Sequence, residues 1–276
     1  MSLQDTFPRT SQVPVQSPLF WVTHKDRYLR QLLIQDIEAT TGRDLLVYFT
    51  DVDNSDAQID VGDDQFLIEL LKGKKGESVD LLLETAGGYT DATEKVCSLL
   101  QQMAPDLRVI VPRKAKSNGT LIALAGSSIV MSTTSELGPI DPSVMGIPAE
   151  FVVKDPQAYP AQVVRTAETA ARQTQTLASS LLTGGMMKGK TAVEVADTVQ
   201  KLATRDCYAS HGSVIDAIEA KSLGLKVDFY EPSDQLWEKI WLLRTMYAYD
   251  CPRNGYAKLF ESARISSAVA IKISAP

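Results

Sequence analysis

The chain has 276 residues, 44% of them hydrophobic, and carries a formal net charge of −6 with a sequence pI of about 5.1. This length can build one sizeable hydrophobic core, and the acidic balance argues against a dedicated nucleic-acid surface. Since no apolar run reaches the length of a membrane span and the first residues lack the layout of a secretion signal, we expect no integral membrane segment.

The number and spacing of the cysteines and histidines limit the kinds of disulfide and metal site that the chain can form. Cys97, Cys207 and Cys251 are odd in number and widely spaced, a pattern that fits neither a disulfide framework nor a metal site. With only two histidines, His24 and His211, a histidine-rich metal centre is not expected. The sequence therefore predicts a cytoplasmic protein without a metal or other cofactor.

The first half of the chain alternates apolar strands with helical patterns. Residues 1–18 are polar and contain prolines, which predicts a mobile arm. The elements predicted after it are a helix at 25–40, a strand at 44–50, a short helix at 66–71, a strand at 79–84, a helix at 89–104, a strand at 107–112, a helix at 117–126 and a strand at 128–131. Successive strand–helix units favour parallel strands joined by right-handed crossovers, so the predicted fold class is α/β.

The second half is richer in helix. Five prolines between residues 138 and 160 keep any helix there brief. The elements predicted after them are a long helix at 161–183, helices at 191–202 and 213–223, and a strand at 225–229. Aromatic residues are frequent from residue 234, where we expect a helical extension that packs on the domain or contacts another subunit. The predicted units are thus an arm at 1–18, a domain at 19–233 and a helical C-terminal extension at 234–276.

Two turns of this pattern carry residues that suggest catalysis. Ser117 opens an apolar helix directly after a strand, where free N–H groups and the positive end of the helix dipole are available. One strand–helix unit earlier, the Gly87–Gly88 pair can aim backbone N–H groups at the same point, because no Cβ blocks close approach. Together the turns outline a nucleophile and an oxyanion hole. Read alone, Ser117 could instead be a plain helix N-cap.

The order of these motifs resembles the serine dehydrogenase proteinase family, prokaryotic relatives of signal peptide peptidase A. The resemblance rests on an E-T-x-G-G turn at 84–88, an S-x-G-T-x-I-A-L-A helix at 117–125 and an L-G-P-I-D-P run at 137–142. It implies the Clp protease/crotonase fold, a spiral of ββα units that usually assembles into oligomers, and peptide hydrolysis through an acyl-enzyme. It places Ser117 on the nucleophile position, with Gly87 or Gly88 and the N–H of Asn118 on the oxyanion-hole positions.

The same resemblance implies a lysine as general base, with its pKa lowered by burial. Alignment of the long helix places Thr169 in the slot of that lysine. The only lysine between residues 116 and 188 is Lys154, which follows the apolar run at 151–153. We therefore predict a Ser117–Lys154 dyad in which this apolar stretch partly buries the amine.

A Clp-type triad would need a histidine shortly after residue 142, and none is present. His211 is distant in sequence and is the alternative base, while Asp141 is expected to order its loop rather than to act in a triad. The predicted function is a serine peptidase acting on peptides or unfolded proteins, as a homo-oligomer. The alternative is a catalytically inactive peptide-binding or scaffold member of the same fold.

One further motif fits a different function. Residues 184–191 match the G-x-x-x-x-G-K-[ST] phosphate-binding loop. Such a loop follows a β-strand, whereas the run at 174–182 is helical by its pattern and alanine content. The sequence therefore predicts a hinge between two helices here, with nucleotide binding as the alternative.

Overall fold

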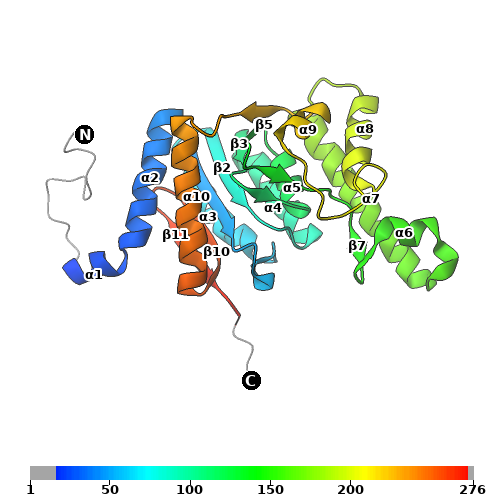
Figure 1. Ribbon diagram of the computed structural model, residues 1–276, viewed down its shortest axis with the longest axis horizontal. Helices are drawn as coiled ribbons and strands as arrows, with labels where there is room; N and C mark the ends of the chain where they lie inside the picture. Colours follow the sequence, from blue (N-terminus) through cyan, green and yellow to red (C-terminus); the bar gives the residue numbers. More distant parts are fainter. Residues whose placement is uncertain (1–16, 273–276) are drawn as a thin grey trace.

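The computed structural model describes residues 17–272 and has a central β-sheet with helices on both faces (Figure 1). The predicted arm at residues 1–18 lies outside the described residues except for Ser17, which caps the first helix, and Pro18, which begins it. The seven strands of the sheet are β1 (Asp44–Thr50), β2 (Ser78–Glu84), β3 (Asp106–Ile110), β5 (Ser128–Met131), β9 (Val227–Phe229), β10 (Tyr256–Glu261) and β11 (Ser266–Ala270). Their spatial order is β11-β10-β1-β2-β3-β5-β9. The five strands from β1 to β9 are parallel, which confirms the α/β prediction.

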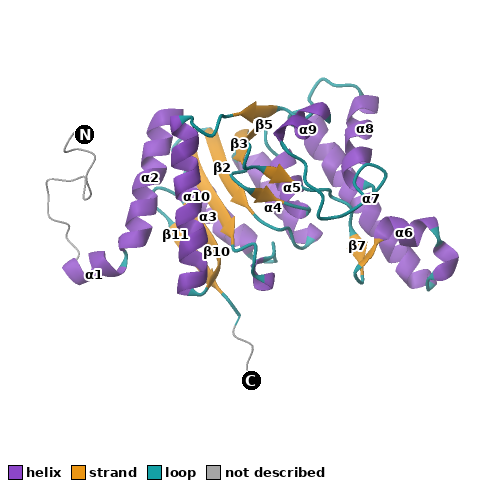
Figure 2. Cartoon of the chain, in the orientation of Figure 1, coloured by secondary structure: helices purple, strands orange, loops and turns teal. Residues whose placement is uncertain are grey.

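Helices cover both faces of this sheet (Figure 2). They are α1 (Pro18–Thr23), α2 (Lys25–Thr41), α3 (Asp63–Lys72), α4 (Thr90–Met103), α5 (Asn118–Leu124), α6 (Ala149–Lys154), α7 (Ala161–Gly184), α8 (Ala192–Ala203), α9 (Ala217–Ser222) and α10 (Gln235–Asn254), with 3-10 turns at Ser55–Ala57 and Pro156–Ala158. Two small sheets pair β4 (Lys114–Ala115) with β6 (Glu136–Leu137) and β7 (Ser143–Val144) with β8 (Ile147–Pro148). Within residues 17–272, no helix combines the length and the apolar character needed to cross a membrane.

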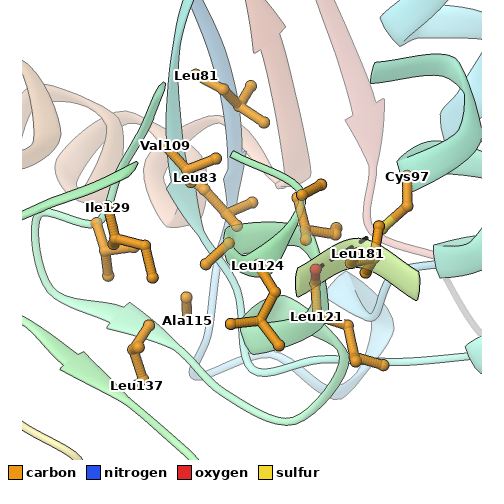
Figure 3. Packing of buried hydrophobic residues seen from close by; sticks show 14 of the residues in the cluster. Leu81, Leu83, Cys97, Val109, Ala115, Leu121, Leu124, Ile129, Leu137 and Leu181 are labelled. Atoms are coloured by element: carbon orange, nitrogen blue, oxygen red, sulfur yellow. Dashed lines mark hydrogen bonds between the residues drawn. The ribbon is translucent and has the colours of Figure 1, made fainter. Parts of the chain in front are cut away.

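Two hydrophobic cores explain why the strands are so apolar. Side chains of β1 alternate between them: Leu46 and Tyr48 enter the larger core with α3, α4 and α5, while Val47 and Phe49 face α2 and α10. The larger core is shown in Figure 3, where Leu121 and Leu124 of α5 lie among side chains from the strands and from α7. A strand buried on both faces reads as a continuous apolar run rather than an alternating one.

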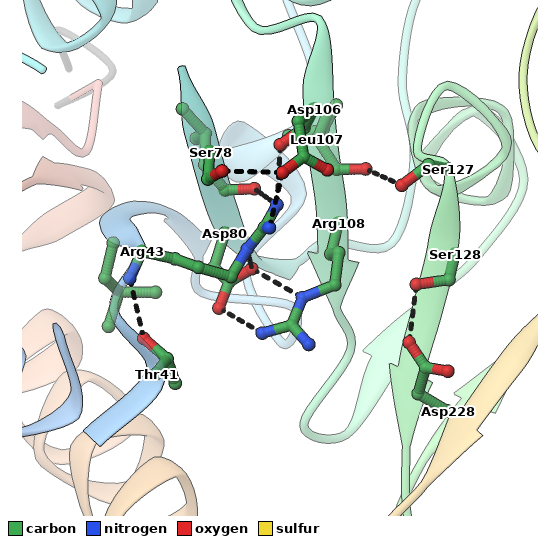
Figure 4. A network of polar contacts seen from close by, with 12 residues as sticks. Thr41, Arg43, Ser78, Asp80, Asp106, Leu107, Arg108, Ser127, Ser128 and Asp228 are labelled. Carbon is green, nitrogen blue, oxygen red and sulfur yellow. Dashed lines mark hydrogen bonds and ion pairs between the residues drawn. The ribbon is translucent and has the colours of Figure 1, made fainter. Parts of the chain in front are cut away.

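A polar network ties the amino-terminal halves of neighbouring strands together (Figure 4). Arg43, directly before β1, pairs with Asp80 of β2 at 2.7 Å and with Asp106 of β3 at 2.7 Å. Arg108 of β3 reaches the same Asp80 at 2.8 Å, so two guanidinium groups compensate one buried carboxylate. This network therefore stabilises the amino edge of the sheet. The opposite, carboxyl edge is where open α/β sheets place their ligands.

The C-terminal segment is not the purely helical extension that the sequence predicts. Only 235–254 is helical, and β10 and β11 then add two antiparallel strands beside β1. The aromatic residues Trp237 and Tyr247 of α10 are buried against the sheet of their own chain. The segment after residue 234 therefore completes the domain.

A buried ion pair fixes α10 to the strand that leads into the glycine turn. Arg244 donates from Nε and Nη2 to the two carboxylate oxygens of Glu84, the last residue of β2, at 2.8 and 2.5 Å. Burial raises the pKa of the Glu84 carboxyl, and the Arg244 guanidinium opposes that shift. The charge of Glu84 therefore depends mainly on α10, with Arg113 as a more distant partner at 3.9 Å.

We expect Arg244→Met to lower the free energy of unfolding by about 3–5 kcal/mol, because it leaves the Glu84 carboxylate without its bidentate partner. Urea unfolding followed by circular dichroism measures the change. The double variant Arg244→Met/Glu84→Gln should recover part of the loss, since no unpaired charge remains. Equal destabilisation by the single and double variants would contradict this account.

Candidate active site

The serine turn and the glycine turn lie side by side at the carboxyl edge of the sheet. Thr85, directly after β2, forms a parallel bridge with Ala115 of β4. Its N–H donates to the Lys114 carbonyl at 2.9 Å, and its carbonyl accepts from the Lys116 N–H at 3.0 Å. Thr85 and residues 114–116 are therefore joined by backbone hydrogen bonds, which bring the two turns together where they begin.

Ser117 has a strained backbone. Its φ of 53° and ψ of −122° lie outside the regions that side chains with a Cβ normally occupy. It stands at the N-cap position of α5, yet its side chain makes no capping hydrogen bond, so the plain N-cap interpretation does not account for it. Within residues 17–272 its hydroxyl has no hydrogen-bond partner, although the residue is half-buried. The turn thus holds a free hydroxyl at the strand-to-helix junction.

Gly87 and Gly88 are required for this arrangement by close contacts. A Cβ on Gly87, which has φ of 107°, would lie 2.9 Å from the Cβ of Ser117. A Cβ on Gly88 would lie 2.3 Å from the backbone oxygen of Ile59. Both distances are too short for real Cβ atoms, so only glycine allows the loop to pass between Ser117 and Ile59.

The orientation of one N–H group follows from peptide planarity. The Gly87 carbonyl accepts from the Ile59 N–H at 2.9 Å, and the N–H of Gly88, on the same planar peptide, points the opposite way. Gly87 itself donates its N–H to Thr85 Oγ1 at 3.1 Å. In the described part of the chain the N–H groups of Gly88 and Asn118 make no hydrogen bond. The glycine turn and the turn that carries Ser117 therefore each hold one backbone donor without a partner.

Lys154 does not lie in the environment predicted for a base. It ends α6 with its side chain 62% exposed, paired with Glu150 and, at 3.3 Å, with Asp206. Hydrogen bonds to these two carboxylates raise the pKa of Lys154, opposite to the shift that a lysine base needs. The prediction that Lys154 is partly buried is wrong. Thr169, in the expected lysine slot, is exposed and donates to the Arg165 carbonyl at 2.9 Å.

His211 and Asp141 form a pair across 70 residues of sequence. His211 Nδ1 lies 2.7 Å from Asp141 Oδ1. Arg205 holds the other carboxylate oxygen with Nε and Nη2, both at 3.0 Å. With Nδ1 facing a carboxylate, the other ring nitrogen is free to take a proton. Sequence reasoning missed this pairing because spacing along the chain gives no signal for it.

The loop that carries His211 runs against the residue before Ser117. Lys116 Nζ donates to the Ser213 carbonyl at 2.9 Å and to the Leu137 carbonyl at 3.1 Å. Burial lowers the pKa of Lys116, but its ammonium is taken up by these carbonyls and by Glu136 at 3.5 Å. Lys116 thus joins the His211 loop to the turn that carries Ser117.

The phosphate-loop motif has a different context from a nucleotide site. It follows α7 rather than a strand, and Thr191 caps α8 through a capping box with Glu194. Lys190 pairs with the same Glu194 at 3.1 Å. The prediction of a connection between two helices is confirmed. Among the described residues, no group of three or more histidine, cysteine or acidic side chains could hold a metal ion.

A family model described as ClpP-like SDH-type serine proteinase matches residues 58–251. The chain belongs to this family. The match contains both turns, the His211–Asp141 pair and most of α10.

Two relatives come from Methanocaldococcus jannaschii. The uncharacterized protein MJ0137 is 31% identical over 200 residues, which are 70% of this chain and 66% of that protein. The uncharacterized protein MJ1495 is 27% identical over 179 residues, which are 61% of this chain and 56% of that protein. The chain thus spans less than two thirds of the length of either relative.

Two solved structures are similar to this chain at lower sequence identity. A mutant of the 1510-N membrane-bound stomatin-specific protease has 22% sequence identity and a TM-score of 0.44, covering 66% of this chain and 79% of that one. A mutant ClpP1 from Listeria monocytogenes has 15% identity and a TM-score of 0.44, covering 75% of this chain and 99% of that one.

Proposed function

We propose that this ClpP-like serine proteinase hydrolyses peptide bonds through an acyl-enzyme on Ser117, with His211 as general base and Asp141 as its partner. The observation that carries the proposal is the strained Ser117, whose free hydroxyl stands beside two unpaired backbone N–H groups. Strain of this kind costs about 1–3 kcal/mol and persists where function requires it.

The steps follow from the residues present. Ser117 Oγ attacks the carbonyl carbon while its proton passes to His211, and the new oxyanion accepts from the N–H groups of Gly88 and Asn118. The C–N bond then breaks as His211 returns the proton to the leaving amine. Water, activated by the same imidazole, hydrolyses the ester. Asp141 keeps Nδ1 protonated and stabilises the imidazolium.

Substrate, assembly and location belong to the same proposal. Tyr89 is 59% exposed directly after Gly88 and offers an apolar contact for a peptide side chain, which supports peptides or unfolded proteins as substrates. The exposed apolar residues Met145 and Phe151, near the small cluster of α6 and α7, support a homo-oligomer. The three free cysteines support a cytoplasmic location.

A second candidate is a non-catalytic peptide-binding protein. It is favoured by one observation, that within residues 17–272 no base hydrogen-bonds to the Ser117 hydroxyl. Catalytic hydrogen bonds are often long in free enzymes and tighten when substrate binds, so this observation leaves the first proposal ahead.

The deciding experiment is reaction of the full chain with a fluorophosphonate probe, followed by mass spectrometry, alongside cleavage of fluorescently labelled casein. We expect a covalent adduct on the peptide that contains Ser117, and casein cleavage that the probe abolishes. Chain unfolded in urea serves as the control and should not react. Intact casein together with an unlabelled Ser117 would support the binding protein instead.

A further inference from the structure

The Asn118 side chain links the two halves of the proposed oxyanion hole. It is 7% exposed, and its Nδ2 donates to the Gly88 carbonyl at 2.5 Å and to Thr90 Oγ1 at 3.3 Å. A carbonyl can only accept, so the amide nitrogen must be the atom that faces Gly88. Within the described residues, this is the only hydrogen bond between α5 and residues 87–89.

The glycine turn needs such a link because its backbone hydrogen bonds to other segments run to Ile59 and not to α5. The groups that flank Gly88 are held from the far side, where Ile59 binds the Gly87 carbonyl and the Tyr89 N–H, each at 2.9 Å. These two bonds, together with the planar Gly87–Gly88 peptide, set the direction of the Gly88 N–H, but they do not set its separation from the Asn118 N–H on α5.

We propose that the Asn118 carboxamide is a positioning residue that fixes the Gly88 N–H relative to the Asn118 N–H, so that both point at one oxygen. By holding the Gly88 carbonyl, it restrains the backbone of the residue that supplies the first donor. Its own backbone supplies the second donor. One residue therefore sets the separation of both groups. This inference rests on the proposed function of the site.

A structural role alone would have a different signature. A buried hydrogen bond contributes about 1 kcal/mol to stability wherever it lies, and its loss lowers the melting temperature without changing turnover. A positioning role acts on the transition state, because donors must lie about 2.7–3.1 Å from the position that the oxyanion takes. It lowers kcat and leaves KM nearly unchanged, since the ground-state carbonyl depends less on both donors.

The test compares Asn118→Ala and Asn118→Asp with wild type in the full chain, using hydrolysis of p-nitrophenyl butyrate and inhibition by a peptide aldehyde. Asn118→Asp keeps the shape but sets a carboxylate against the Gly88 carbonyl. We expect kcat to fall about tenfold to a hundredfold in Asn118→Ala and further in Asn118→Asp, below the loss of about a hundredfold to a thousandfold for an absent donor. Aldehyde affinity should fall in parallel, and KM should stay within about twofold of wild type.

Asn254→Ala is the control away from the site, because the exposed Asn254 also donates from Nδ2 to a backbone carbonyl, that of Asp250 at 2.8 Å, at the far end of α10. It should lower the melting temperature without changing kcat. The inference is overturned if both Asn118 variants turn over as wild type does, if only KM changes, or if neither variant folds, since the amide would then be a determinant of folding. A wild-type chain that hydrolyses neither casein nor the ester would refute the proposed function itself.

Discussion

Replacing Ser117 with glycine is expected to abolish hydrolysis and to make the protein more stable than Ser117→Ala does. Both variants remove the proposed nucleophile, and loss of such a serine lowers kcat by on the order of a millionfold. Alanine keeps a Cβ at φ of 53°, whereas glycine adopts this conformation without strain. Ser117→Gly should therefore exceed Ser117→Ala by about 1 kcal/mol in free energy of unfolding. Urea unfolding and casein cleavage measure the two effects.

Met145 provides the matched control for strain. Besides Ser117, it is the only non-glycine residue with positive φ in the described part of the chain, at 55°, and it is 84% exposed in the β7–β8 hairpin. Met145→Gly should gain similar stability while leaving the Ser117 turn unchanged. If Ser117→Gly were no more stable than Ser117→Ala, the turn would not store strain, and the observation on which the proposed function depends would lose its meaning.

The order of elements was predictable because it depends on local pattern. The strand at 44–50 and the turn at 84–88 are visible as a buried apolar run and a glycine pair. The strand β10 was missed because its Lys258 and Glu261 look like surface residues. They are buried only because Asp63 and Arg30, 195 and 231 positions away, compensate their charges. A local sequence pattern does not show which distant residue will neutralise a buried charge.

The candidate site likewise contains residues that the sequence could predict and residues that it could not. Ser117 and the glycine pair stand in short motifs, so sequence could name them, although not the backbone strain at Ser117. Lys154 was chosen for its apolar neighbours, but α6 buries only Val152 of that run and leaves Phe151 and Val153 49% and 39% exposed. A short helix on the surface exposes most of its residues whatever their hydrophobicity. The His211–Asp141 contact depends on the path of the loop after α8, which no pattern encodes.

Substitution of the two candidate bases is expected to give opposite results. His211→Gln should lower kcat by on the order of a millionfold, because loss of the triad base costs about as much as loss of the nucleophile. Asp141→Asn should lower it by about 10⁴-fold, since an amide favours the wrong imidazole tautomer. Lys154→Gln should leave kcat within about twofold of wild type, because its partners are solvent-exposed or shared.

The measurement is casein cleavage at equal concentrations of folded variant, with melting temperature recorded for each. Stability separates the catalytic role from the structural one, because Asp141 also holds Arg205 and its loss could loosen the loop. Arg205→Gln controls for that: it breaks the ion pair but leaves the Asp141 carboxylate beside Nδ1 of His211. If Lys154→Gln were inactive and His211→Gln active, the base would be the lysine after all, and α6 would have to move toward Ser117 when substrate binds. If His211→Gln, Asp141→Asn and Lys154→Gln all cleaved casein as wild type does, neither His211 nor Lys154 would activate the Ser117 hydroxyl. The binding function would then be the better explanation of the strained turn.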